Sequence, residues 1–237
     1  RRLRRYRVFG NWWRPEWRRF RELVRTGAPV SATILAEAGL FSGAAFLMGR
    51  IGPEQLAGHT VALQLAALAF QVPFGVAQAA TIRVGYFYGA RDSAAIARAG
   101  WTAIIIGGGF MTITAGLMLF APRFLIRLYV DPDAAQNALL VGFALRYMVI
   151  AAAFQLFDGI QAVSAGSLRG LQDTRVPMWM ALFGYWVPGL GTAIVLGFFT
   201  PQQGTGIWIG LAIGLVVVAG LLLQRWARRA RLGLLPV

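Results

Sequence analysis

Residues 31–50 read SATILAEAGLFSGAAFLMGR, a stretch of apolar and small residues with one carboxylate, Glu37, inside it. About 20 such residues are enough to cross the roughly 30 Å hydrocarbon layer of a membrane as a helix. An ionisable side chain inside a membrane span is costly and is a functional-site hypothesis by default. The stretch therefore predicts a membrane fold and marks a residue on which its chemistry depends.

The composition of the 237-residue chain supports a membrane protein. Apolar residues make up 57% and charged residues only 14%, whereas soluble domains carry about 25% charged residues. The chain has no cysteine and one histidine, His59, which excludes disulfides, thiolate metal sites and a multi-histidine metal centre. No Ser-His-acid or Cys-His arrangement is present, so we expect neither an enzyme nor a bound cofactor.

Six segments are long and apolar enough to span a membrane as helices. They cover residues 28–49, 56–84, 100–120, 147–167, 176–199 and 206–223. No alternating pattern typical of barrel strands appears, so we expect an all-α membrane protein. Basic segments at 1–26 and 225–237 flank a membrane region of residues 27–224. The first methionine is Met48, inside a span, and we interpret the chain as part of a longer polypeptide.

The arginines give the expected orientation. Nineteen of the 23 basic residues fall in the two flanking segments and in the loops after the second and fourth spans, whereas Arg50, Arg123 and Arg127 fall on the opposite side. The positive-inside rule then predicts that both termini are cytoplasmic. Arginines placed beside apolar spans also argue against nucleic-acid binding. The apolar stripe of Trp13, Trp17, Phe20 and Val24 fits either a helix lying on the membrane surface or a solvated basic linker.

Two acids lie near the middle of their predicted spans, Glu37 in the first and Asp158 in the fourth. Arg146, on the same span as Asp158, is about 18 Å away along a helix, too far to pair with it. Two unpaired acids at similar depth predict a shared cation or proton site. A pair of protonated structural acids is the alternative interpretation.

Other polar and aromatic residues recur near these acids. Gln155, Asp158, Gln161 and Ser164 recur every three residues, and Gln64, Gln71 and Gln78 every seven. We take Gln71, Gln78, Phe154, Gln155 and Gln161 as candidates for lining a cavity. Phe70 and Phe74 join Phe154 as candidates for contact with a flat cation. The glutamines alternatively serve only as hydrogen-bond partners between helices.

Three motifs carry a family resemblance. GAPVSATILAEAGLF (27–41), PFGVAQAATIRVG (73–85) and FDGIQAVSAGSLRGLQDTR (157–175) occur in the same order as in the multidrug and toxic compound extrusion (MATE) family, which the chain resembles over about 110 residues. The matched residues resemble spans seven to twelve of the family's proteins. Those spans form one lobe of a twelve-helix, two-lobe transporter. The resemblance implies that residues 1–26 link the lobes and that the N-terminal lobe of the same chain is missing here.

The resemblance also implies a function. It implies a secondary antiporter of the bacterial inner membrane, which exports small cationic amphipathic compounds in exchange for H⁺ or Na⁺, contacts membrane lipids and needs no cofactor. Glu37 and Asp158 match the acids that bind cations and drugs in the family. If Na⁺ is the coupling ion, we expect it to bind at these two acids, and we expect no other metal site. Some members have tyrosine where this chain has Phe154, which favours protons.

Two other functions stay open from the sequence. A flippase of lipid-linked oligosaccharides belongs to the same superfamily, but it would favour basic residues in its cavity, to hold pyrophosphate. A non-transporting membrane scaffold would not need two matched acids in its spans. The acids make the antiporter the first of the three hypotheses.

Overall fold

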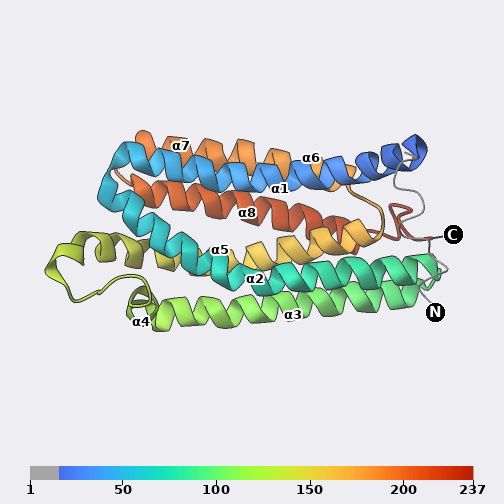
Figure 1. Ribbon diagram of the computed structural model, residues 1–237, viewed down its shortest axis with the longest axis horizontal. Coiled ribbons are helices and arrows are strands. Elements are labelled where there is room, and N and C mark those ends of the chain that lie inside the picture. The colour runs from blue at the N-terminus through green and yellow to red at the C-terminus, as the bar shows by residue number, and fades with distance from the viewer. Residues whose placement is uncertain (1–15, 237) are drawn as a thin grey trace.

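The computed structural model describes residues 16–236, and the regular structure in this range is helical (Figure 1). Six helical segments are long and apolar enough to cross a membrane, which confirms the expected all-α fold and its six spans. The first three are α1 (Trp17–Ile51), α2 (Pro53–Gly89) and α3 (Ser93–Phe120). The others are α5 (Ala138–Gly170) with the short η2 (Ala135–Asn137) before it, a fifth segment of three parts, and α8 (Gly204–Ala227).

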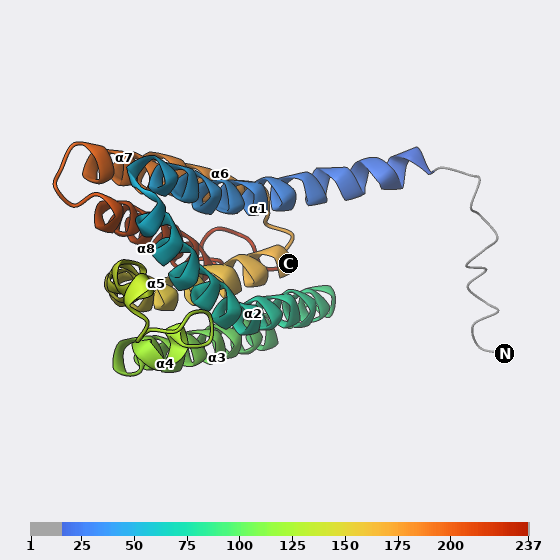
Figure 2. The same ribbon diagram turned by 60° about the vertical axis from the view of Figure 1, so that its left-hand side comes forward.

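The helix α1 begins earlier than the sequence predicted. It starts at Trp17, so residues 17–26, assigned to a linker, continue the first span as helix. Arginine and glutamate are good helix formers, and no proline interrupts the segment before Pro29. Residues 16–26 are all exposed, and the beginning of α1 projects from the bundle (Figure 2). Trp13 and the rest of 1–15 lie outside the described residues, so the surface-helix interpretation stays a prediction.

The helix α5 lies at the centre of the bundle and packs against α2, α3 and α8. Small residues let these helices approach closely. A Cβ atom added to Gly166 of α5 would collide with the backbone of Ala77 in α2. The hydroxyl of Thr81 lies 2.9 Å from the carbonyl oxygens of both Ala77 and Gly166, so it bonds α2 to α5 at the same point. Close approach of this kind is how helices pack tightly in lipid.

The fifth span is not one continuous α-helix. It consists of α6 (Arg175–Gly184), the π-helical turn η3 (Tyr185–Leu190) and α7 (Gly191–Phe198). Pro188 lies inside η3 and has no backbone N–H to donate to the helix, which the wider turn accommodates. The turn packs against α8 and α1. It places Tyr185 inside the bundle, fully buried.

The helices α1 and α2 meet at Gly52 and diverge from there (Figure 2). The short turn between them is anchored by Gln55, at the first turn of α2. Its Oε1 accepts hydrogen bonds from the Tyr147 hydroxyl (3.0 Å) and the Gly204 N–H (3.1 Å), and its Nε2 donates to Gln203 (2.8 Å). Three spans are thereby held together at this end, while α1 and α2 separate toward the other.

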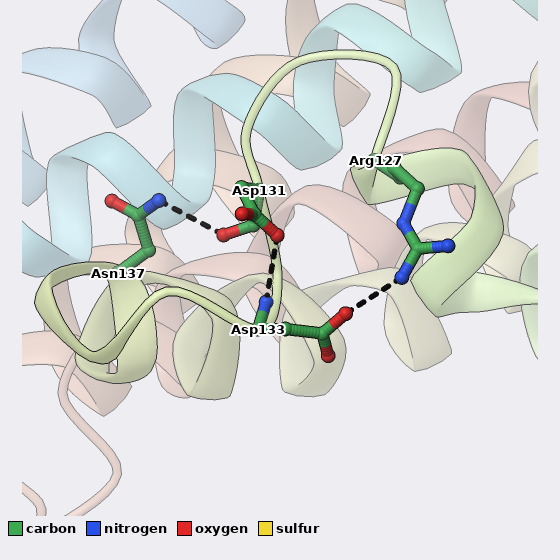
Figure 3. Close-up of polar contacts among 4 residues, drawn as sticks. All are labelled: Arg127, Asp131, Asp133 and Asn137. Atoms are coloured by element: carbon green, nitrogen blue, oxygen red, sulfur yellow. Dashed lines mark hydrogen bonds and ion pairs between the residues drawn. The ribbon is translucent and has the colours of Figure 1, made fainter.

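The two ends of the bundle carry different ion pairs. At one end, the loop after α4 (Pro122–Ile126) carries an exposed pair between Arg127 and Asp133 at 2.7 Å, and Asn137 donates to the Asp131 carbonyl at 2.9 Å (Figure 3). At the other end, α8 runs on to Ala227, so Arg225, the first residue of the expected tail of 225–237, is helical. There it pairs with Asp173, in the turn after α5.

Candidate functional site

A cavity of about 340 Å³ lies between α1, α2 and α5. Most of its lining is apolar, and its polar side chains come from all three helices. Those polar residues are Thr33 and Glu37 of α1, Gln78 of α2, and Asp158, Gln161 and Arg169 of α5. The divergence of α1 from α2 creates this space, and α5 closes its inner wall.

Both predicted acids line this one cavity. Glu37 is half-buried on α1, whereas Asp158 on α5 is only 5% exposed. Gln161, about one turn from Asp158 on α5, lines the cavity together with both acids. The Oδ1 atom of Asp158 has no hydrogen-bond partner among the described residues. The arrangement thus offers carboxylate oxygens to a ligand from two helices at once.

Tyr185, in the η3 turn that packs against α1 and α8, is a polar residue of the bundle interior that the sequence did not single out. It is fully buried. Its hydroxyl has no partner among residues 16–236. A tyrosine three residues before a mid-span proline was the only sequence signal, because a proline there frees backbone groups and distorts the helix.

Aromatic rings form part of the cavity wall. The rings of Phe70 and Phe74, one turn apart on α2, have centroids 6.1 Å apart. Phe154 also lines the cavity, but it is only 1% exposed because its ring stacks on Trp208 at 5.5 Å. Phe70 and Phe74 therefore offer the more accessible aromatic surface.

The four candidate glutamines divide into two groups. Gln78 and Gln161 line the cavity. Gln71, two turns before Gln78 on α2, is exposed outside it, with Nε2 3.4 Å from the Ala67 carbonyl. Gln155 lies between α5 and α3, where it accepts a hydrogen bond from Thr114 (2.7 Å). A stripe with a three-residue step drifts around a helix by about 60° per step, so Gln155 and Gln161 face different neighbours.

Arg169 lines the cavity although it lies beyond the predicted span of 147–167. The helix α5 continues to Gly170, three residues beyond the predicted span, and carries Arg169 into the lining. It also lines a small neighbouring cavity next to Asp173 and Thr174. Among the lining residues it is the one basic side chain against two acids. The cavity is thus complementary to cations near its middle and carries a positive group at one end.

The described part of the chain holds no cluster of metal-ligating side chains. Among residues 16–236, no three acidic, histidine or cysteine side chains gather as metal ligands. His59 is fully buried away from the cavity, with its ring against Trp208 at 5.4 Å. The cavity that holds Glu37 and Asp158 is therefore the candidate site.

Comparison with known proteins gives the same family at three levels. The family model MatE matches residues 29–195. A probable multidrug resistance protein NorM of Mesorhizobium japonicum is 47% identical over 97% of this chain and 49% of its own length. The multidrug resistance protein NorM of Burkholderia vietnamiensis is 41% identical over 94% of this chain and 48% of its own length. The chain thus spans about half the length of the curated relatives it matches.

Solved structures share the fold. The eukaryotic MATE transporter AtDTX14 aligns with a TM-score of 0.76 at 25% identity, over 90% of this chain and 49% of its own. A MATE structure in the bent conformation aligns with a TM-score of 0.81 at 20% identity, over 94% of this chain and 48% of its own. Each similarity covers about half of the neighbour, as expected for one lobe of a two-lobe architecture. With a family match over most of its length and two carboxylates in one membrane cavity, the chain belongs to the MatE family.

Proposed function

We propose that this chain forms the ion- and substrate-binding lobe of an antiporter that exports cationic amphipathic compounds in exchange for H⁺ or Na⁺. The observation that carries the proposal is that Glu37 and Asp158, 121 positions apart in sequence, line one cavity with aromatic and apolar walls. The apolar lining favours the body of an amphipathic compound, and the carboxylates favour its charge. The multidrug resistance names of the relatives support the same substrate class.

The mechanism follows from competition for the carboxylates. A proton or Na⁺ bound at Glu37 or Asp158 neutralises charge there and weakens the hold on a cationic substrate. Conversely, a substrate that contacts Phe70 or Phe74 and the acids displaces the ion. Exposing the cavity alternately to the two sides of the membrane converts this competition into exchange. A second lobe, which the length of the relatives supports, would complete the cavity wall.

The cellular placement is part of the same proposal. In the described chain, Arg83 and Arg98 lie near the turn between α2 and α3, and Arg225 lies near the end of α8, whereas Arg123 and Arg127 lie in and just after α4. Figure 1 shows the end of α8 beside the turn between α2 and α3, and α4 at the opposite end of the bundle. By the positive-inside rule, the first end faces the cytoplasm. The bacterial relatives support placement in the inner membrane.

The two competing functions are less well supported. A flippase for lipid-linked oligosaccharides has to hold a pyrophosphate, for which the cavity lining offers Arg169 alone, opposed by two acids. A scaffold without transport activity gains nothing from Asp158, a buried carboxylate whose Oδ1 lacks a partner among the described residues. Burial of such a group is costly, which favours a ligand-binding role.

The test uses the protein with both lobes in proteoliposomes. Efflux of a fluorescent cation such as ethidium is measured with a Na⁺ gradient alone and with a pH gradient alone. Glu37→Gln and Asp158→Asn are each expected to reduce exchange at least tenfold, while Glu54→Gln, an exposed acid at the start of α2, retains it. Normal exchange in both acid variants would refute the proposal, and the gradient that drives efflux identifies the coupling ion.

A further inference from the structure

A second and larger cavity lies on the other side of α2, between α2 and α3. It measures about 570 Å³, and each helix contributes one arginine to it, Arg83 from α2 and Arg98 from α3. Arg83 lies nine positions after Phe74 on α2, which places the two side chains on opposite sides of the helix. The groove is therefore separated from the acidic cavity by α2 itself.

The two arginines are not committed to acids. Neither forms an ion pair among the residues the structure describes. The Arg83 guanidinium lies 5.2 Å from the ring centroid of Phe87, a contact that holds it at this end of the groove. Asp92 also lines the groove, but its Oδ1 accepts a hydrogen bond from the Ala95 N–H (2.8 Å) and caps α3. One of its oxygens is thus used by the helix, and Asp92 forms no ion pair with either arginine.

The rest of the groove is apolar or small and extends toward the middle of the bundle. Val76 lies about 10 Å along α2 from Arg83, and Ile106 about 12 Å along α3 from Arg98. Ala79, Ala99 and Ala103 leave the space between them open. The groove therefore has a cationic end near the turn between α2 and α3, and apolar walls toward the middle of the bundle.

We propose that this groove is a binding site for one anionic phospholipid. Arg83 and Arg98 bind the phosphate oxygens, and one acyl chain lies along Val76, Ala103 and Ile106. Guanidinium groups bind phosphate through charge-assisted hydrogen bonds. Basic pockets between spans on the cytoplasmic side are suited to the anionic lipids of that leaflet. Because α2 forms a wall of both cavities, the lipid stabilises the helix that also carries Phe70, Phe74 and Gln78.

The test measures lipid binding to the purified two-lobed protein by native mass spectrometry. Phosphatidylglycerol and phosphatidylcholine with the same acyl chains are compared. The wild type is expected to retain one phosphatidylglycerol with about a tenfold preference over phosphatidylcholine. The Arg83→Gln/Arg98→Gln double variant is expected to lose this preference. Arg91→Gln/Arg228→Gln removes the same charge from the same end at exposed positions outside the groove, and it should bind as the wild type does.

Two further measurements distinguish a bound phospholipid from a free phosphate and from lipid held by charge alone. Ala79→Phe keeps both arginines and fills the groove, so it should reduce lipid retention severalfold. Glycerophosphate, which has the phosphate but no acyl chains, should compete at least a hundredfold more weakly than phosphatidylglycerol. Equal lipid preference in the two double variants, or equal binding of glycerophosphate, would overturn the proposal. The single variants Arg83→Gln and Arg98→Gln provide the same test if the double variant does not fold.

Discussion

Arg225 of α8 and Asp173 of the turn after α5 form a two-point ion pair. Nε lies 2.6 Å from Oδ2, and Nη2 lies 3.1 Å from Oδ1. The side chains are 14% and 9% exposed, so the pair lies inside the packed end of the bundle. It links the fourth span to the sixth beside the small cavity that Arg169 lines. We interpret it as the contact that fixes this end of the lobe.

Removal of one partner from this pair should destabilise the lobe. Asp173→Asn leaves Arg225 as a buried charge without a counterion, a change that costs about 3–5 kcal/mol. The measurement is thermal unfolding of the purified protein in detergent, with a lower midpoint expected.

The exposed pair in Figure 3 provides the matched control for Asp173. The side chains of Arg127 and Asp133 are 65% and 62% exposed, and their atoms lie at a similar distance, 2.7 Å. Exposed pairs contribute about 0–1 kcal/mol, so Asp133→Asn should leave the midpoint nearly unchanged. Equal losses from Asp173→Asn and Asp133→Asn would show that burial of the first pair has no effect on stability.

Gly166 sets the distance between α2 and α5, so alanine at this position should be harmful. The added methyl group would meet the backbone of Ala77, and the helices would have to separate. Such overpacking costs about 1–3 kcal/mol, and it should also loosen the Thr81 hydrogen bond. Thermal midpoint and yield of folded protein are the measurements. Gly142→Ala, on the same helix with open space around it, should cause no loss.

Phe74 should contribute to the binding of flat cations. It is 44% exposed in a wall of the acidic cavity, one turn from Phe70. Phe74→Ala should weaken ethidium binding by about 0.5–2 kcal/mol, the range of a cation–π contact. Fluorescence titration measures the affinity. Phe46→Ala, an exposed phenylalanine of α1 outside the cavity, should have no effect, and an equal loss there would contradict the assignment.

Arg169 should oppose cationic substrates at its end of the cavity. The backbone positions of Arg169 and Asp158 lie about 16 Å apart along α5. Arg169→Gln should therefore tighten binding of a monovalent cation roughly two- to fivefold, the size of a Coulomb energy of about 0.5–1 kcal/mol. The same titration should show a larger effect for a divalent dye. Weaker binding of both dyes would mean that Arg169 instead shapes the cavity.

Part of the candidate site was accessible from the sequence. Glu37 and Asp158 stand out because a charge within an apolar run is rare, and Phe70 and Phe74 share a helix face with a period of four. Gln71 and Gln155 do not line this cavity of the described lobe, since the direction of a glutamine depends on which helix lies opposite it. Tyr185 was missed because a π-helical turn carries it into the interior of the bundle, and Arg169 because three extra residues of helix carry it into the cavity lining.

The sequence by itself determined the class of fold, the six spans and the presence of two acids in them. These properties depend on hydropathy and segment length, which are local to each stretch of chain. Only the tertiary structure decided that Glu37 and Asp158 share a cavity, that Arg225 meets Asp173, and that Arg83 and Arg98 border one groove. Those contacts depend on helix rotation, crossing and ends, which packing between distant segments sets and no single segment encodes.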